Sequence, residues 1–197
     1  MSETFVGFAA FVRLVIDAIE ASDLEYLLGG AVAAWAWGEP RATQDLDVVL
    51  SIPVESIGKL SKELEVRDML VSADVILDAI LDERADFPVS AIHIFSGYKA
   101  DLYFVREFDE LRKSALSRRV RVDLGPQLGE VYLHTPEDLI LNKLWYFSLS
   151  QQSKHLRDIT SIVLTVGEDL EFDYIEDWAD RKGTITLWQE ILERLRN

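Results

Sequence analysis

Apolar residues recur at spacings of three and four over residues 5–20, a pattern that predicts an amphipathic helix early in the chain. The short segment 25–28 then predicts a buried strand, which ends at Gly29-Gly30. The alanine and tryptophan run of residues 31–37 favours a helix, closed soon afterwards by a glycine and a proline. Helix, strand, double glycine and short helix are therefore expected in direct succession.

Later segments rich in Val, Ile, Leu and aromatic residues predict further strands. They are residues 46–52, 90–95 and 99–105, with 120–122 and 131–133 as edge strands. Only Ser96-Gly97-Tyr98 separates the second of these strands from the third. Those two are therefore expected to pair as a hairpin.

Helical spacing accounts for most of the remaining chain. The predicted helices cover residues 53–70, 71–86, 153–166, 173–181 and 186–196, and one more begins at Thr135-Pro136 with an N-cap threonine and a proline in the first turn. The expected fold class is α+β, with a short mixed β-sheet and a helical carboxy-terminal part. We place the boundary between residues 1–128, a catalytic domain, and residues 129–197, a helical subdomain.

The composition narrows the class of protein. With 49% hydrophobic residues, the 197-residue chain can bury a core, yet no apolar run approaches the ~20 residues that cross a bilayer. The chain has no cysteine and shows no secretory signal, so a cytoplasmic location and no membrane partner are expected. A net charge of −15 argues against broad, sequence-blind binding to nucleic acid.

One basic cluster interrupts this acidic chain. It consists of Arg112, Lys113, Arg118, Arg119 and Arg121. A solvated helix end that balances nearby acids is the plain interpretation. An RNA-binding patch beside an active site is the alternative.

Two acids stand out at the start of the 46–52 strand. Residues two apart on a strand face the same side, so Asp45 and Asp47 point together while Leu46 packs behind them. Adjacent carboxylates repel each other, and such oxygen ligands suit magnesium or manganese. Asp101, a single acid in an apolar strand, offers a third carboxylate from a second strand. Turn-capping and edge-strand acids are the alternative interpretation.

The order of double glycine, helix, Asp-x-Asp and a later strand acid resembles the nucleotidyltransferase superfamily related to DNA polymerase beta. Within it, the chain resembles the branch of AbiEii and MenT-type toxin nucleotidyltransferases. The resemblance extends from about Leu27 to Ile159. It rests on Gly29-Gly30, on Arg41-x-Thr43-x-Asp45-Leu46-Asp47, and on Thr135-Pro136-Glu137-Asp138-Leu139 followed by Lys143.

The resemblance implies a Mg²⁺-dependent enzyme that moves a nucleoside monophosphate from an NTP to an acceptor hydroxyl. Asp45 and Asp47 would bridge two Mg²⁺ ions, with Mn²⁺ as the alternative metal, and Asp101 would hold the ion nearest the hydroxyl and accept its proton. The glycines would let the backbone approach the phosphates. The residues expected to bind the nucleotide are Gly29, Gly30, Arg41, Thr43, Lys143 and Asp158.

The acceptor stays open at this point. The toxin-like branch favours the end of an RNA such as tRNA and implies a cognate antitoxin as a partner, whereas the acidity of the chain favours a small molecule or a protein side chain. A non-catalytic nucleotide-binding or interaction module of a toxin–antitoxin or regulatory pair is the alternative class. The three intact acids argue against that alternative.

Histidines and tryptophans complete the candidates. His93 and His134 lie near predicted strands, where a lone histidine is more often structural than catalytic. The tryptophans are predicted to belong to the core or an interface, with stacking of one of them on a base as the alternative. They are Trp35, Trp37, Trp145, Trp178 and Trp188.

Overall fold

The computed structural model describes residues 6–82 and 87–196. Its sheet contains the strands β1 (Glu25–Leu28), β2 (Asp45–Ser51), β3 (Met69–Leu70), β4 (Val89–His93), β5 (Lys99–Phe104), β6 (Val120–Asp123) and β7 (Glu130–Leu133). The helices are α1 (Phe8–Ala21), α2 (Gly30–Trp37), α3 (Ile57–Glu65), α4 (Ala73–Leu81), α5 (Glu110–Arg118), α6 (Pro136–Ser150), α7 (Ser153–Val166), α8 (Phe172–Arg181) and α9 (Ile185–Arg196). The predicted α+β class is confirmed.

The strands form one mixed sheet in the order β3-β4-β5-β2-β1-β7-β6. The pairs β2–β5 and β1–β7 are parallel, and the other neighbours are antiparallel. The predicted hairpin is confirmed as β4–β5. Of the two predicted edge strands only β6 lies at an edge, because β7 also pairs with β1 through Leu28 and Leu133.

Two elements escaped the pattern analysis. The predicted 53–70 helix is a short 3₁₀ turn (Val54–Ser56) followed by α3. The chain then turns at Asp68, which has a left-handed φ of 60°, and continues into β3. Helix α5 was not predicted because its polar sequence buries only Ala115 and Leu116. The predicted helix start at Phe5 and the predicted helix end at Asp86 lie outside the described residues.

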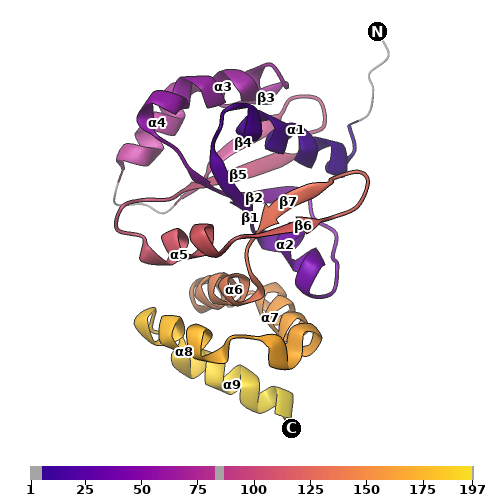
Figure 1. The fold of residues 1–197 in the computed structure, drawn as a ribbon, viewed down its shortest axis with the longest axis vertical. Coiled ribbons are helices and arrows are strands. Elements are labelled where there is room, and N and C mark those ends of the chain that lie inside the picture. Colours follow the sequence, from indigo (N-terminus) through magenta and orange to yellow (C-terminus); the bar gives the residue numbers. More distant parts are fainter. Residues whose placement is uncertain (1–5, 83–86, 197) are drawn as a thin grey trace.

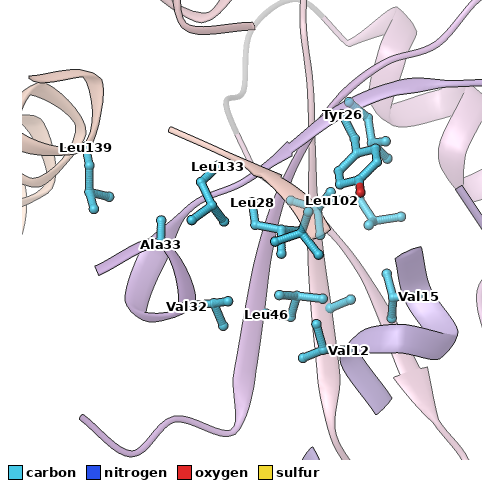
Figure 2. Packing of buried hydrophobic residues seen from close by; sticks show 14 of the residues in the cluster. Val12, Val15, Tyr26, Leu28, Val32, Ala33, Leu46, Leu102, Leu133 and Leu139 are labelled. Atoms are coloured by element: carbon cyan, nitrogen blue, oxygen red, sulfur yellow. The ribbon is translucent and has the colours of Figure 1, made fainter. Parts of the chain in front are cut away.

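The core forms where α1 and α2 pack on the sheet. Figure 2 shows Val12 and Val15 of α1 beside Leu46 of β2 and Leu102 of β5, all of them inaccessible to solvent. A smaller cluster, in which Leu27 and Val49 contact Ala115 and Leu116, packs α5 on the other face of the sheet. Alternate residues of β2 therefore pack in the core, which leaves Asp45 and Asp47 to face the second side.

The helical part, α6 to α9, lies at one end of the molecule, while the sheet with α1, α3 and α4 lies at the other (Figure 1). Helix α6 begins as predicted, since Thr135 caps it by accepting a hydrogen bond from the Asp138 amide and Pro136 occupies the first turn. Within residues 6–82 and 87–196, no helix is both long and apolar enough to cross a membrane.

Candidate active site

Asp47 and Asp101 are register partners on the parallel strands β2 and β5, and Asp45 pairs in the same way with Lys99. All three acids line one cavity of about 320 Å³, a volume within the range typical of small-molecule sites, roughly 300–1,000 Å³. Burial raises the pKa of Asp47 above its ordinary value. The positive charge of Lys143 opposes this shift, and the negative charges of Asp101 and Asp45 add to it.

Lys99 is a site residue that the sequence analysis did not single out. Its Nζ atom donates to Asp101 Oδ2 at 2.9 Å and lies 3.7 Å from Asp45 Oδ1. Ser90 of β4 donates to the other Asp101 oxygen at 2.6 Å. An ammonium group thus stands between two of the acids, which shows that they attract a cation.

The fit to a metal depends on how these side chains are arranged. Carboxylate oxygens from neighbouring strands are the ligand type that Mg²⁺ prefers. With the side chains as they stand, however, the described residues contain no group of three or more acids or histidines that could hold one ion. Binding of a metal by all three acids therefore requires Lys99 to withdraw from Asp101.

The double glycine lies directly against Asp47. Gly29 donates its amide to the Asp47 carbonyl at 2.9 Å, and Gly30 starts α2 with a left-handed φ of 58°. A Cβ atom on Gly30 would lie 1.7 Å from Asp47 Oδ2, so no other residue fits there without moving the carboxylate. At Gly29 a Cβ would meet the His134 ring at 3.1 Å.

Arg41 and Thr43 line the same cavity from the segment that leads into β2. The Thr43 hydroxyl donates to the Asp45 carbonyl at 2.9 Å and accepts from the Asp45 amide at 3.2 Å, so it fixes the turn that presents this acid. The Trp35 indole donates to the Arg41 carbonyl at 3.1 Å. A tryptophan of α2 therefore supports this segment.

Lys143 of α6 is buried, lines the cavity and donates to Asp158 Oδ2 at 2.7 Å. Asp158 of α7 also accepts from Arg41, at 3.2 Å from Nε. The structure thus brings all nine candidate residues to one region, but Asp158 lies behind Arg41 and Lys143 rather than among the residues that line the cavity.

His134, at the end of β7, is buried and lines the cavity. Burial, together with the positive charges of Arg112 and Lys143, lowers its pKa to about 3, so the ring is neutral at pH 7. The His134 amide donates to the Leu28 carbonyl at 3.1 Å, and the His134 carbonyl accepts from the Trp37 indole at 2.9 Å, so its backbone is held on both sides. His93 lies elsewhere, buried against Phe11 and hydrogen-bonded to Ser96, as expected of a structural histidine.

Residues of α6 and of the start of α7 also line the cavity, and among them Tyr146 stacks on His155 with ring centroids 6.0 Å apart. Burial lowers the pKa of His155 to about 4. The sequence analysis missed this pair, because its members are nine positions apart and no motif marks them. The stacked rings offer a flat aromatic surface among the residues that line the cavity.

The basic cluster is largely matched with acids. Arg118 pairs with Glu137, Asp138 and Glu171, and its guanidinium lies 4.0 Å from the centre of the Tyr174 ring. The other members pair as Arg112–Asp109, Lys113–Glu110, Arg119–Glu25 and Arg121–Glu130. Of the five, Arg112 lines the cavity. The cluster therefore balances nearby acids, as its plain interpretation predicted.

Neither a protein-family model nor a curated protein matches the sequence. Solved structures do match the fold. The solution structure of the antibiotic-resistance factor ANT(2'')-Ia gives a TM-score of 0.60 at 16% identity, covering 94% of this chain and 95% of that chain. A crystal structure of ANT(2'')-Ia in complex with adenylyl-2''-tobramycin gives 0.58 at 15% identity, covering 89% and 97%.

A third match is an antigenic nucleotidyltransferase-like protein from Paracoccidioides brasiliensis, with a TM-score of 0.56 at 14% identity, covering 91% of this chain and 90% of that chain. The specific branch of AbiEii and MenT-type toxins stays a prediction. The structural neighbours of this chain are nucleotidyltransferases, and its mixed seven-stranded sheet with the surrounding helices is the nucleotidyltransferase fold.

Proposed function

We propose that this protein transfers a nucleoside monophosphate from an NTP to a hydroxyl group of a small acceptor molecule, with release of pyrophosphate. The observation that carries the proposal is the register pairing of Asp47 with Asp101 in the cavity that Gly30, Arg41 and Lys143 also line. Acids and cations that line one cavity suit the metal-bound and phosphate parts of a nucleotide.

The glycine turn would receive the phosphates. The first amides of α2, which follow this turn, favour an anion. Arg41 and Lys143 supply positive charge at the same cavity. The stacked Tyr146 and His155 rings, which line the same cavity, would then be available to the base or the sugar.

Asp45, Asp47 and Asp101 would hold the Mg²⁺ ions, with Mn²⁺ as the alternative, and Asp101 would also serve the acceptor hydroxyl. When bound, the metal neutralises the charge that develops on the triphosphate and on the departing pyrophosphate. Lys99 would have to release Asp101 for this arrangement. The Ser90 hydroxyl would keep that carboxylate oriented meanwhile.

The chemical step is an in-line displacement at the α-phosphorus. The acceptor oxygen forms the new bond to phosphorus while the bond from phosphorus to the bridging α–β oxygen breaks, and the electron pair leaves with pyrophosphate. The hydroxyl proton passes to the Asp101 carboxylate. Asp101 is buried and has one oxygen on Ser90, which suits a group that must act from a fixed position.

A small acceptor is favoured over RNA by the charges on the protein. The basic cluster is ion-paired, and the chain carries a net charge of −15, so little unmatched positive surface is offered to a polyanion. A small, hydroxyl-rich acceptor also agrees with the adenylyl-2''-tobramycin found in the complex of ANT(2'')-Ia.

The test is a label-transfer assay. The protein is incubated with each α-³²P-labelled NTP and Mg²⁺ or Mn²⁺, together with tobramycin and other polyhydroxylated small molecules, with bulk tRNA, or alone. We expect label on a small molecule, with an equal amount of pyrophosphate, and transfer reduced by about 100-fold or more in the Asp47→Asn variant. Label on tRNA would show that the acceptor is RNA and not a small molecule, and it would support a toxin role with a cognate antitoxin. If the protein binds nucleotide but transfers no label, the result would support a non-catalytic nucleotide-binding module instead.

A further inference from the structure

Asp158 holds together two cations that come from different parts of the chain. One of its oxygens, Oδ2, accepts from Lys143 Nζ at 2.7 Å, and the other, Oδ1, accepts from Arg41 Nε at 3.2 Å. A second, longer contact joins Arg41 Nη2 to Oδ2 at 3.5 Å. One carboxylate thus joins α7 to α6 and to the segment before β2.

Because Asp158 and Lys143 are buried, loss of either partner costs more stability than it would in an exposed pair. The side chains of Asp158 and Lys143 are only 4% and 6% exposed, whereas that of Arg41 is 30% exposed. A buried ammonium group is costly without a counter-charge, and two neighbouring cations repel each other unless an anion lies between them. Asp158 meets both requirements.

The position of Asp158 also matters. Lys143 and Arg41 line the cavity, while Asp158 lies behind them. The cavity therefore presents two cations at a fixed spacing, with one unit of positive charge in excess over Asp158. A triphosphate would contact the cations and leave Asp158 in place.

We propose that Asp158 is a positioning residue, which acts on the nucleotide through Lys143 and Arg41 and not by contact. The proposal rests on the proposed function, because it takes the phosphates of an NTP as the ligand of the two cations. A direct contact between Asp158 and the nucleotide, or a purely structural ion pair, would give different effects of Asp158 variants on the Kd for NTP.

The first experiment compares Asp158→Asn with the wild-type protein. Asparagine keeps the size of the side chain and one acceptor oxygen but removes the charge that holds the cations. We expect the Kd of the Mg²⁺–NTP complex, measured by calorimetry, and the KM to rise by about 10- to 100-fold. A change of this size corresponds to the loss of one charge-assisted hydrogen bond. The change in kcat should be much smaller. An unchanged Kd in a folded Asp158→Asn variant would overturn the proposal.

Glu137→Gln is the matched control. Glu137 is also a buried carboxylate paired with an arginine, Arg118. It is not one of the described residues that line the cavity. We expect this variant to lower the melting temperature and to leave the Kd for NTP unchanged. If Glu137→Gln weakens NTP binding as much as Asp158→Asn does, loss of structure explains both and the proposal fails.

A double-mutant cycle separates positioning from contact. In a Lys143→Met background, which lacks the closer of the two cations, we expect Asp158→Asn to weaken binding by several-fold less than it does in the wild-type background. A direct contact between Asp158 and the nucleotide would give the same fold loss in both backgrounds. Should Asp158→Asn fail to fold, Asp158→Glu keeps the charge but shifts it, and an unchanged Kd in that variant would contradict a positioning role.

The failure of this proposal is distinguishable from the failure of the proposed function. If the wild-type protein binds no NTP under any condition tested, the proposed function is wrong and Asp158 has no nucleotide to position. If the wild type binds NTP and the cycle shows equal losses in both backgrounds, only the positioning role is wrong.

Discussion

Lys99 Nζ donates to Asp101 Oδ2 at 2.9 Å, so an ammonium group occupies the place beside this acid where a metal ion would bind. Hydrogen bonding to Asp101 raises the pKa of Lys99 above its ordinary value, so the contact favours the charged form of the lysine. A fixed positive charge among three carboxylates reduces their repulsion. It also competes with any divalent ion for the same oxygens.

We therefore expect Lys99→Met to lower the melting temperature of the metal-free protein and to increase the rise that Mg²⁺ produces. Thermal melts over a Mg²⁺ titration would measure both effects. Lys59→Met is the control, because Lys59 pairs at 2.6 Å with the exposed Asp23 and neither residue is among those that line the cavity. An identical response to Mg²⁺ in Lys99→Met and wild type would contradict competition by Lys99.

Asp47→Asn should separate stability from activity. The raised pKa of Asp47, caused by burial and by the neighbouring acids, means that its charged form is disfavoured in the metal-free site. Removal of the charge should leave the metal-free melting temperature equal to that of the wild type or slightly higher. The stabilisation by Mg²⁺ and NTP should shrink, and transfer should fall by about 100-fold or more.

The same melts and the label-transfer assay test this expectation. Glu65→Gln, which removes an exposed acid at the end of α3, serves as the control and should change none of the three quantities. A metal-free Asp47→Asn protein that melts far below the wild type would mean that Asp47 is a structural residue, and the site assignment would be wrong.

A graded series of glycine substitutions tests the turn. Gly30→Ala combines a left-handed φ of 58° with a Cβ placed 1.7 Å from Asp47 Oδ2, so it should both destabilise the protein by about 1 kcal/mol or more and displace the carboxylate, which abolishes transfer. In Gly29→Ala the tightest contact is with the His134 ring, at 3.1 Å, and Asp47 Cβ lies at an ordinary 3.8 Å, so this change should cost less.

Gly58→Ala is the matched control for this series. Gly58 lies in α3, and a Cβ there would meet nothing within 4 Å. This substitution should stabilise the protein by about 0.5–1 kcal/mol without changing transfer. Denaturant unfolding and the transfer assay would rank the three variants. Full activity in Gly30→Ala would show that the close approach to Asp47 has no role.

His134 predicts a pH dependence of stability. Its folded-state pKa of about 3 lies below the ordinary value of 6.5, so the unfolded chain takes up the proton first as the pH falls. The contribution of His134 to the free energy of unfolding is therefore complete above pH 6.5. It is lost as the pH falls toward 3, by about 1.4 kcal/mol per pH unit while this group alone titrates.

The measurement compares denaturant unfolding of wild type and His134→Gln between pH 4 and pH 7, chosen as roughly the window of this titration. Asp47 and Asp138, whose pKa values are raised mainly by burial, change stability in the opposite direction, but they are common to both proteins. We expect the wild type to lose more stability than the variant below pH 6.5. Parallel pH profiles would show that His134 becomes protonated in the folded protein as easily as in the unfolded chain.

Local patterns predicted most of the fold because most elements bury an apolar face. The β2 strand and the hairpin β4–β5 follow directly from alternation and a short turn. Strand β3 was lost inside a predicted helix because two residues, Met69 and Leu70, carry no period of their own. Its existence depends on pairing with β4, which is a tertiary contact.

The acids and glycines of the site were accessible to sequence reasoning because strand alternation and a motif mark them. Lys99 was not, since only the parallel register of β2 and β5 places it opposite Asp45. The ion pairs of Asp158 were also hidden, because they join residues 41, 143 and 158 from three separate elements. Long-range contacts of this kind have no local signature.

Because β2 and β5 are parallel, the chain between them can change in length without moving the acids. That intervening segment contains α3, β3, α4 and β4, and it returns the chain to its place beside β2. Insertions in the loops around α4 would leave Asp47 opposite Asp101, since the strand register alone sets their distance. A slip of β5 by a single residue would instead turn Asp101 to the opposite face of the sheet. Relatives of this chain can therefore differ widely in this segment, while their strand registers must agree.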